Sequence, residues 1–113
     1  MSWTYSHEPD ANDRDWVRWK VTDTDEADKL VEDEEIDAEL AAQPSKALAA
    51  VAVARVIARK FARLASGQSI GKLSEQYAER ARLYAALVDK LEEEVGAGAA
   101  AGHTSMTDLR FAW

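Results

Sequence analysis

Twenty-one carboxylate side chains are the most numerous groups in this 113-residue chain that could bind a metal ion or transfer a proton. Asp23, Asp25 and Glu34 match the first, third and twelfth positions of a calcium-binding loop, which places oxygen ligands at fixed spacings. Ala27, at the fifth position, has no ligating atom. Asp28 stands at the sixth position, where the sharp turn of such a loop requires glycine. These two departures favour a solvated polar turn, and we predict no metal site.

Groups for acid–base or nucleophilic catalysis are scarce. The only histidines, His7 and His103, lie in the two presumed tails, and the chain has no cysteine. The carboxylates occur in charged runs and not among apolar residues, where burial would raise a pKa towards neutrality. No glycine-rich phosphate loop and no histidine pair at metal-ligand spacing occurs. We therefore predict that the protein is not an enzyme and needs no cofactor.

Opposite charges are segregated along the chain, whose net charge is −7. Residues 1–43 carry a net charge of −10, residues 44–73 carry +6 with no acidic side chain, and residues 74–113 carry −3. An acidic chain repels nucleic acid unless its basic groups form a separate patch. We favour pairing of these blocks, within the chain or between copies of it. No apolar run is long enough to span a membrane, and the acidic start does not fit a signal peptide. We therefore expect a soluble protein. The lack of cysteine suits a cytosolic setting.

The basic block belongs to a long helix expected over residues 45–66. Ser45 is a suitable amino-terminal cap, and Gly67 is suited to a left-handed conformation that ends the helix. Arg55, Arg59 and Arg63 recur every four residues and therefore share one face. The opposite, apolar face holds seven residues: Ala50, Val53, Ala54, Ile57, Ala58, Phe61 and Leu64. Residues 47–54 have no polar side chain and are expected to be covered on every side.

A second long helix is expected over residues 74–95, with Ser74 as its cap. Its apolar residues alternate at spacings of four and three, which is typical of a helix packed along a partner: Tyr77, Ala81, Tyr84, Val88, Leu91 and Val95. Leu83 and Leu87 widen this stripe enough to contact the first long helix in an antiparallel hairpin.

Two short helices are expected before residue 45. Trp16 and Trp19 share one face of the first, which Asn12 or Asp10 caps; we interpret them as anchors to the core, with an exposed partner contact as the alternative. The second, over residues 30–43, is acidic and ends before a proline. We therefore predict an all-α fold: a small helical bundle over residues 12–95 that follows a flexible arm over residues 1–11.

Residues 96–113 are expected to form a Gly/Ala linker over 96–102 and a terminal segment. Leu109, Phe111 and Trp113 alternate with small or polar residues, as in an extended strand. Either this end is disordered, or it docks on another protein by adding to the edge of a sheet. Exposed apolar side chains lower solubility, so we favour docking.

The order of these segments carries a family resemblance over about Asp13–Glu94. A short helix runs into a TDTD turn, LVEDEEIDAEL follows at Leu30–Leu40, and a long alanine-rich helix comes next. The stretch SIGKLSEQYAERARLYAAL at Ser69–Leu87 then leads into a helix with two tyrosines. In this order and spacing the chain resembles the head–tail connector, or adaptor, proteins of long-tailed bacteriophages. Glu32 stands where a capping Ser or Thr is expected, which moves the expected helix start to Asp33.

The resemblance implies a structural protein of the virion neck, assembled in the host cytoplasm. Such proteins form a ring, often of twelve copies, beneath the portal protein of the filled capsid. The ring extends a channel through which DNA passes without sequence-specific binding, and it presents a surface to the head-completion (stopper) or tail protein. A ring needs two different, complementary faces on each copy. The expected faces are the arginine stripe and an acidic set, Glu32, Glu35 and Glu39, while Leu109, Phe111 and Trp113 are expected to grip the portal or a neighbour.

Two other classes remain open from the sequence. One is a small acidic helical regulator, antitoxin-like, that acts by protein–protein binding and whose arginine stripe could touch DNA phosphates. It lacks a recognisable helix-turn-helix, and its net charge is unfavourable for DNA. The other is a secreted helical-hairpin dimer with a Trp-x-Gly turn, although the turn over residues 67–73 has no tryptophan.

Overall fold

The computed structural model describes residues 2–67 and 71–103, with the backbone alone for residues 97–103. All regular structure in these residues is helical, which confirms the expected all-α class: α1 (Asp13–Lys20), a 3-10 turn η1 (Glu26–Asp28), α2 (Asp33–Ala42), α3 (Lys46–Gly67) and α4 (Gly71–His103). None of these helices combines the length and the apolar character that crossing a membrane requires.

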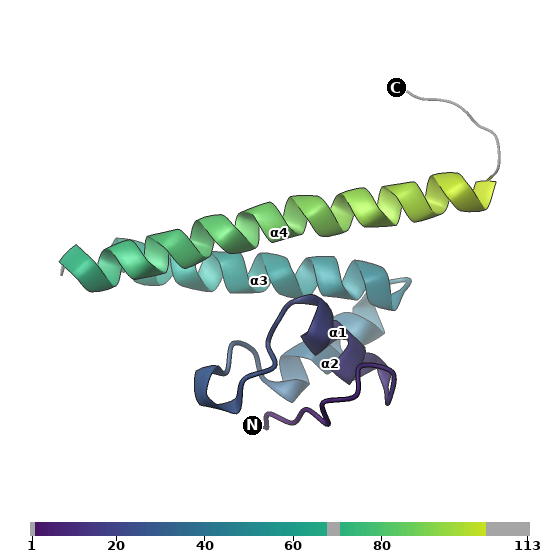
Figure 1. Ribbon diagram of the computed structural model, residues 1–113, viewed down its shortest axis with the longest axis horizontal. Helices are drawn as coiled ribbons and strands as arrows, with labels where there is room; N and C mark the ends of the chain where they lie inside the picture. Colours follow the sequence, from purple (N-terminus) through teal and green to yellow (C-terminus); the bar gives the residue numbers. More distant parts are fainter. Residues whose placement is uncertain (1, 68–70, 104–113) are drawn as a thin grey trace.

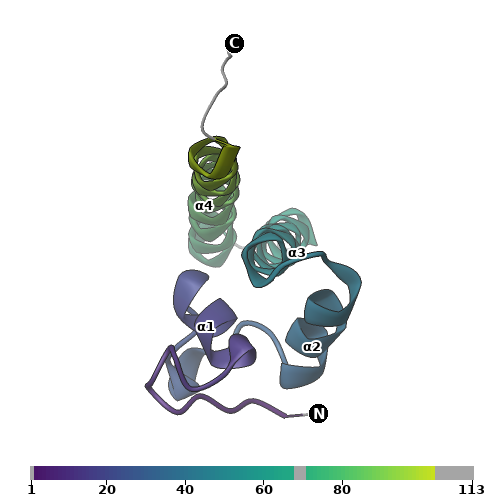
Figure 2. The same ribbon diagram turned by 90° about the vertical axis from the view of Figure 1, so that its right-hand side faces the viewer.

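Helices α3 and α4 lie side by side along most of α3, and the chain runs along α4 in the direction opposite to α3 (Figure 1). Helices α1 and α2 lie on another side of α3, near its amino-terminal half, and contact each other (Figure 2). The carboxyl-terminal end of α4 extends beyond the other helices (Figure 1). The core therefore lies where α1, α2 and α4 meet the first half of α3.

Burial along α3 follows the expected apolar face. Its buried residues are Ala49, Ala50, Val51, Val53, Ala54, Ile57 and Phe61. Ala58 is half-buried, and Leu64 is 38% exposed because it lies beyond the part of α3 that α1 and α2 cover. From the other elements, Val17 of α1, Val21 directly after it, Ile36 of α2, and Val88 and Leu91 of α4 complete the centre of the core.

Helix α4 differs from its expected bounds at both ends. It begins at Gly71, and Ser74 lies within its first turn, where the hydroxyl donates to the carbonyl of Ala65 on α3 (2.9 Å). At the other end the expected linker over residues 96–102 is helical, because α4 continues to His103. Alanine has the highest helix propensity, and isolated glycines, at about 1 kcal/mol each, do not end a helix that is already formed.

Three local expectations also need correction. Gly67 belongs to α3, and no glycine in the described residues has a positive φ, so Gly67 does not form a left-handed cap. Trp19 is 50% exposed, whereas Trp16 packs against the core. Leu83 is 58% exposed and does not join the contact with α3, although Leu87 does.

Capping explains where the other helices begin. The Asn12 side chain accepts from the backbone N–H of Asp15 (2.8 Å), and the Ser45 hydroxyl accepts from that of Leu48 (3.2 Å). Helix α2 begins at Asp33, as the departure at Glu32 predicts. Each of these contacts satisfies a donor that the first turn of a helix leaves free.

The arm over residues 1–11 is the largest departure from expectation. Residues 2–11 pass beside α1 and α2 and are held by hydrogen bonds (Figure 1). The carbonyl of Ser2 accepts from the backbone N–H of Asp33 (2.6 Å), and the N–H of Ser2 donates to Glu34 (2.9 Å). The amino-terminal segment is therefore part of the folded domain.

Candidate functional site

Arg18, in the middle of α1, is completely buried. Its guanidinium forms an ion pair with Asp23 and a second with Asp33 (2.6 Å). It also donates to the carbonyls of Thr4 (2.8 Å) and Val31 (3.0 Å). A buried charge is tolerated only when it is paired and its donors are satisfied, so these four groups account for the position of Arg18.

The two acids that pair with Arg18 connect the arm, the TDTD turn and α2. Asp23 is completely buried and accepts from the backbone N–H groups of Leu30 (3.0 Å) and Val31 (3.1 Å). The indole N–H of Trp3 also donates to Asp23 (3.1 Å), and the Trp3 ring lies 4.8 Å from the Arg18 guanidinium. Asp33 accepts from the N–H (3.0 Å) and hydroxyl (2.8 Å) of Thr4. We call Trp3, Thr4, Arg18, Asp23 and Asp33 the Arg18 cluster.

The three carboxylates that match the calcium-loop pattern make separate contacts in the structure. The carboxylate of Asp23 is occupied by Arg18, while Asp25 caps η1 by accepting from the N–H of Ala27 (2.9 Å). Glu34 accepts from the backbone N–H (2.9 Å) and the hydroxyl (2.8 Å) of Ser2. Within residues 2–67 and 71–103, no group of His, Cys, Asp and Glu is arranged to hold a metal ion.

The Arg18 cluster predicts how stability depends on pH. Burial acts to raise the pKa of Asp33, but hydrogen bonds from Arg18 and Thr4 and the charge of Arg14 outweigh it, so the pKa lies below its ordinary 3.8. Because the unfolded chain then binds more protons, Asp33 contributes stability above its ordinary pKa that is lost as the pH falls below it. We expect urea midpoints to fall between about pH 5 and about pH 2, and Asp33→Asn to flatten that fall.

Asp10→Asn, which changes an exposed carboxylate, is the control and should keep the wild-type fall. A residual slope is expected in Asp33→Asn because the pKa of Glu34 and Glu35 is also lowered. Hydrogen bonds from Ser2 cause the shift at Glu34; at Glu35, burial opposes the shift and is outweighed by hydrogen bonds from Glu32 and Lys60. An unchanged slope in Asp33→Asn would contradict the assignment.

The arginine stripe lies on the exposed side of α3. Arg59 and Arg63 are exposed, whereas Arg55 pairs with Glu92 of α4 (2.6 Å). Between α3 and α4 on this side is a hollow of about 500 Å³, which we call the arginine seam: Arg55, Ala58, Arg59, Ala62, Ala81, Arg82, Ala85, Val88 and Asp89. Arg82 was missed, because its position on an exposed face of α4 carries no signal in the sequence.

Of the acidic set, Glu32 directly precedes α2, and Glu35 and Glu39 already have partners within the chain. Glu35 pairs with Lys60 of α3 (3.0 Å) and accepts from the backbone N–H of Glu32 (2.9 Å). Glu39 accepts from the side chain of Gln43 (3.2 Å). Glu35 therefore contacts α3 through its ion pair with Lys60. This contact lies on a different side of α3 from the arginine seam.

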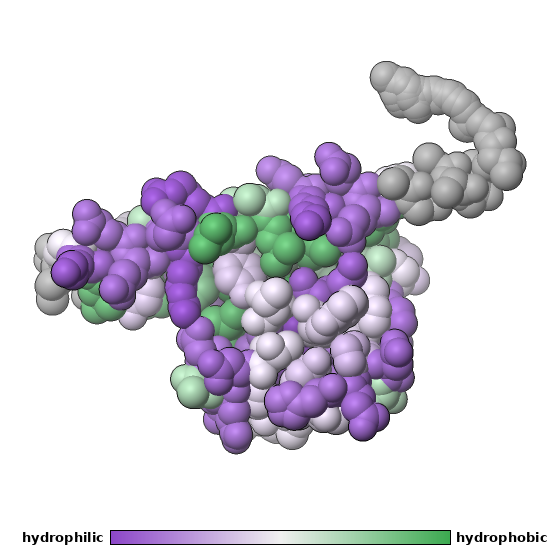
Figure 3. All heavy atoms as spheres, viewed as in Figure 1, coloured by the Kyte–Doolittle hydropathy of each residue, from purple (hydrophilic) through white to green (hydrophobic). Residues whose placement is uncertain are grey.

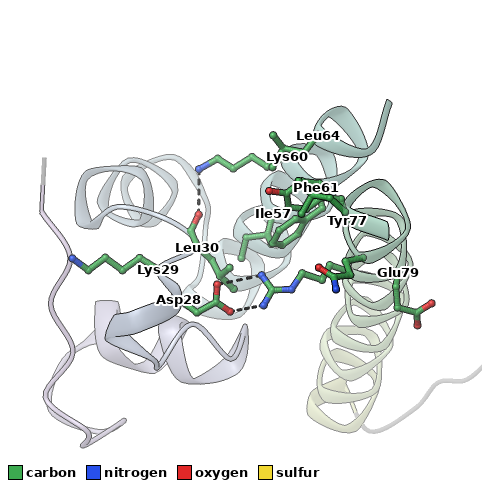
Figure 4. A pocket seen from close by; sticks show the side chains of 12 residues that line it. Asp28, Lys29, Leu30, Ile57, Lys60, Phe61, Leu64, Tyr77 and Glu79 are labelled. Atoms are coloured by element: carbon green, nitrogen blue, oxygen red, sulfur yellow. Dashed lines mark hydrogen bonds and ion pairs between the residues drawn. The ribbon is translucent and has the colours of Figure 1, made fainter. Parts of the chain in front are cut away.

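Apolar surface gathers where α4 meets the rest of the domain (Figure 3). The largest hollow that we describe, about 710 Å³, lies between η1, the second half of α3 and the start of α4 (Figure 4). We call it the aromatic groove. Its apolar wall consists of Leu30, Ile57, Phe61, Leu64, Leu73 and Tyr77. The rings of Phe61 and Tyr77 are stacked, with centroids 6.1 Å apart.

Charged side chains border the aromatic groove. Arg80 of α4 forms two hydrogen bonds with Asp28 of η1 (2.6 and 3.2 Å) and lies 5.0 Å from the ring of Phe61. Lys60 donates to the carbonyl of Leu30 (3.3 Å). An apolar wall with a few charged groups at its border is typical of a binding site for an apolar group. The sequence could not show this groove, because its wall comes from three separate segments.

Leu109, Phe111 and Trp113 lie outside the described residues.

Comparisons of the chain with protein-family models, with curated proteins and with solved structures find no match.

Proposed function

We propose that this protein is a structural component of a bacteriophage virion, a head–tail connector that forms a ring beneath the portal protein. In this role it extends the DNA channel and joins the filled capsid to the head-completion or tail protein. The fold proposed for it is a small helical bundle built on two long antiparallel helices. It acts without a cofactor, as a binding protein and not as an enzyme.

The observation that best supports a ring is that two sides of α3 differ in chemistry. One side carries the arginine seam, and the other is covered by α2, on which Glu34 and Asp37 are exposed and Glu39 is partly exposed. A contact between unlike faces leads from one copy to the next and closes into a ring when the rotation permits. A contact between like faces would instead join two copies in a symmetric dimer.

The resemblance to connector proteins gains support from the Arg18 cluster. Two segments that carry it, the TDTD turn and the acidic start of α2, supply Asp23 and Asp33 to one arginine. The spacing of these two segments along the chain therefore has a structural role, since it lets both acids pair with Arg18. An overall acidic protein also suits a channel along which DNA must move without being held.

Solution mass, measured with and without the portal protein encoded in the same genome, tests this proposal. We expect the chain alone to be monomeric or weakly associated, because its small core needs no permanent partner. With portal, we expect a complex whose mass equals the portal ring plus a ring of this chain, of about twelve copies by the resemblance. A stable dimer that portal leaves unchanged would contradict the proposed assembly.

A further inference from the structure

We propose that the aromatic groove binds the segment that contains Leu109, Phe111 and Trp113 from a second copy of this chain. This inference goes beyond the proposed function, since the groove and the segment belong to the same chain and their contact needs no portal. It names the occupant of a surface that the fold leaves open.

The groove is shaped to hold large apolar side chains. Phe61 and Tyr77 form its floor, and Leu64 and Leu73 at its edge remain 38% and 37% exposed. These two are among the few large apolar side chains exposed in the described residues. Exposed apolar groups gathered around one hollow are a feature of surfaces that a partner covers. The terminal segment supplies the matching chemistry, with one aliphatic and two aromatic side chains within five residues.

The groove cannot bind the same segment of its own copy. It lies at the start of α4, and the helix leads away from it for about 34 Å between Arg80 and His103, at 1.5 Å per residue. Leu109 follows His103 by six residues, which span at most about 22 Å when fully extended. Phe111 reaches no farther than about 29 Å from His103, and Trp113, ten residues after His103, no farther than about 36 Å, which is only the Arg80 border of the groove. The three side chains can therefore occupy the groove together only in another copy.

Such a contact joins unlike parts of two copies, a groove on one and a terminal segment on the next. Repeated, it forms a closed ring or an open chain and not a symmetric pair. The arginine seam lies on a different side of α3 and stays available for a second contact between the same copies. Linked contacts of this kind are stronger together than either is alone.

The test uses full-length chain with Phe111→Ala and Trp113→Ala, which keeps the groove and removes the anchors of its own terminal segment. The probe is a fluorescent peptide of residues 104–113, and binding is followed by anisotropy. We expect saturable binding, and a dissociation constant raised at least about tenfold when Leu64→Glu or Leu73→Glu is added, because buried anchors dominate such contacts. Leu83→Glu, at a 58% exposed position of α4 outside the groove, is the matched control and should bind like the parent.

Leu64 and Leu73 lie on different helices, and both are partly exposed. If both variants weaken binding, the common cause is the groove and not a folding defect in one helix. Equal affinity for the two groove variants and the control would overturn the inference, as would absence of binding to the parent. Binding of the peptide to portal protein but not to this chain would also overturn it. That result would leave the proposed connector function intact, because the ring could still form through the arginine seam.

Discussion

Replacing Arg18 with methionine is expected to lower the free energy of unfolding by about 3–5 kcal/mol, the typical cost of breaking a buried ion pair by removing one partner. Asp23 and Asp33 are completely and almost completely buried, and both would lose their cationic partner. The carbonyls of Thr4 and Val31 would also lose a donor. For a domain of about 100 residues, each kcal/mol lowers the melting temperature by roughly 4–8 °C.

Arg55→Met is the matched control. Arg55 of α3 is partly exposed and pairs with Glu92 of α4 (2.6 Å) at the surface. A surface ion pair contributes about 1 kcal/mol or less, so the control should remain close to wild type. Urea denaturation followed by circular dichroism measures both variants. Equal, small losses for Arg55→Met and Arg18→Met would show that the Arg18 cluster does not hold the domain together.

The helices were predictable because their signals are local. Asn12 and Ser45 cap the helices that they were expected to cap, and an apolar period marks α3. The start of α2 at Asp33 was likewise predicted from a single unusual residue, Glu32. Such signals depend on neighbours within one or two turns, which the sequence displays directly.

The Arg18 cluster was not predictable, because its members are distant in sequence and polar. An arginine in the middle of a short, charged helix favours a position facing solvent. Its burial depends on Thr4, Asp23 and Asp33, which three separate segments supply. The arm shows the same limit: hydrogen bonds to backbone and side chains hold it without any apolar period.

Surfaces between helices are equally hidden in a sequence. The spacing of Arg55, Arg59 and Arg63 predicts a shared face, but not that Arg82 of α4 lies beside the first two. Nor does it show that Arg55 is already paired with Glu92. A hollow between two helices depends on how they pack, and the order of residues along either helix does not reveal it.

Reversing the charge of Arg59 and Arg63 to glutamate is expected to abolish ring formation on the portal. Both side chains are exposed on α3, and Arg59 borders the arginine seam. A glutamate at these positions would repel the acidic side of the neighbouring copy, which the arginine attracts. Because the same contact recurs between every pair of copies in a ring, the loss of binding free energy is repeated around the ring. Each variant chain should still melt like wild type, because exposed charges contribute little to the fold.

Lys72→Glu with Lys90→Glu is the matched control, since it makes the same change in net charge at two other exposed positions. The control should assemble, whereas Arg59→Glu with Arg63→Glu should remain free when both are measured by light scattering with portal. Added salt should weaken the wild-type ring, since it screens exposed charges over a shorter distance. If instead the arginine face is merely solvated, the arginine variant assembles as well as the control and the ring is insensitive to salt. The contact between copies would then depend on apolar surface, and the aromatic groove would be the first place to seek it.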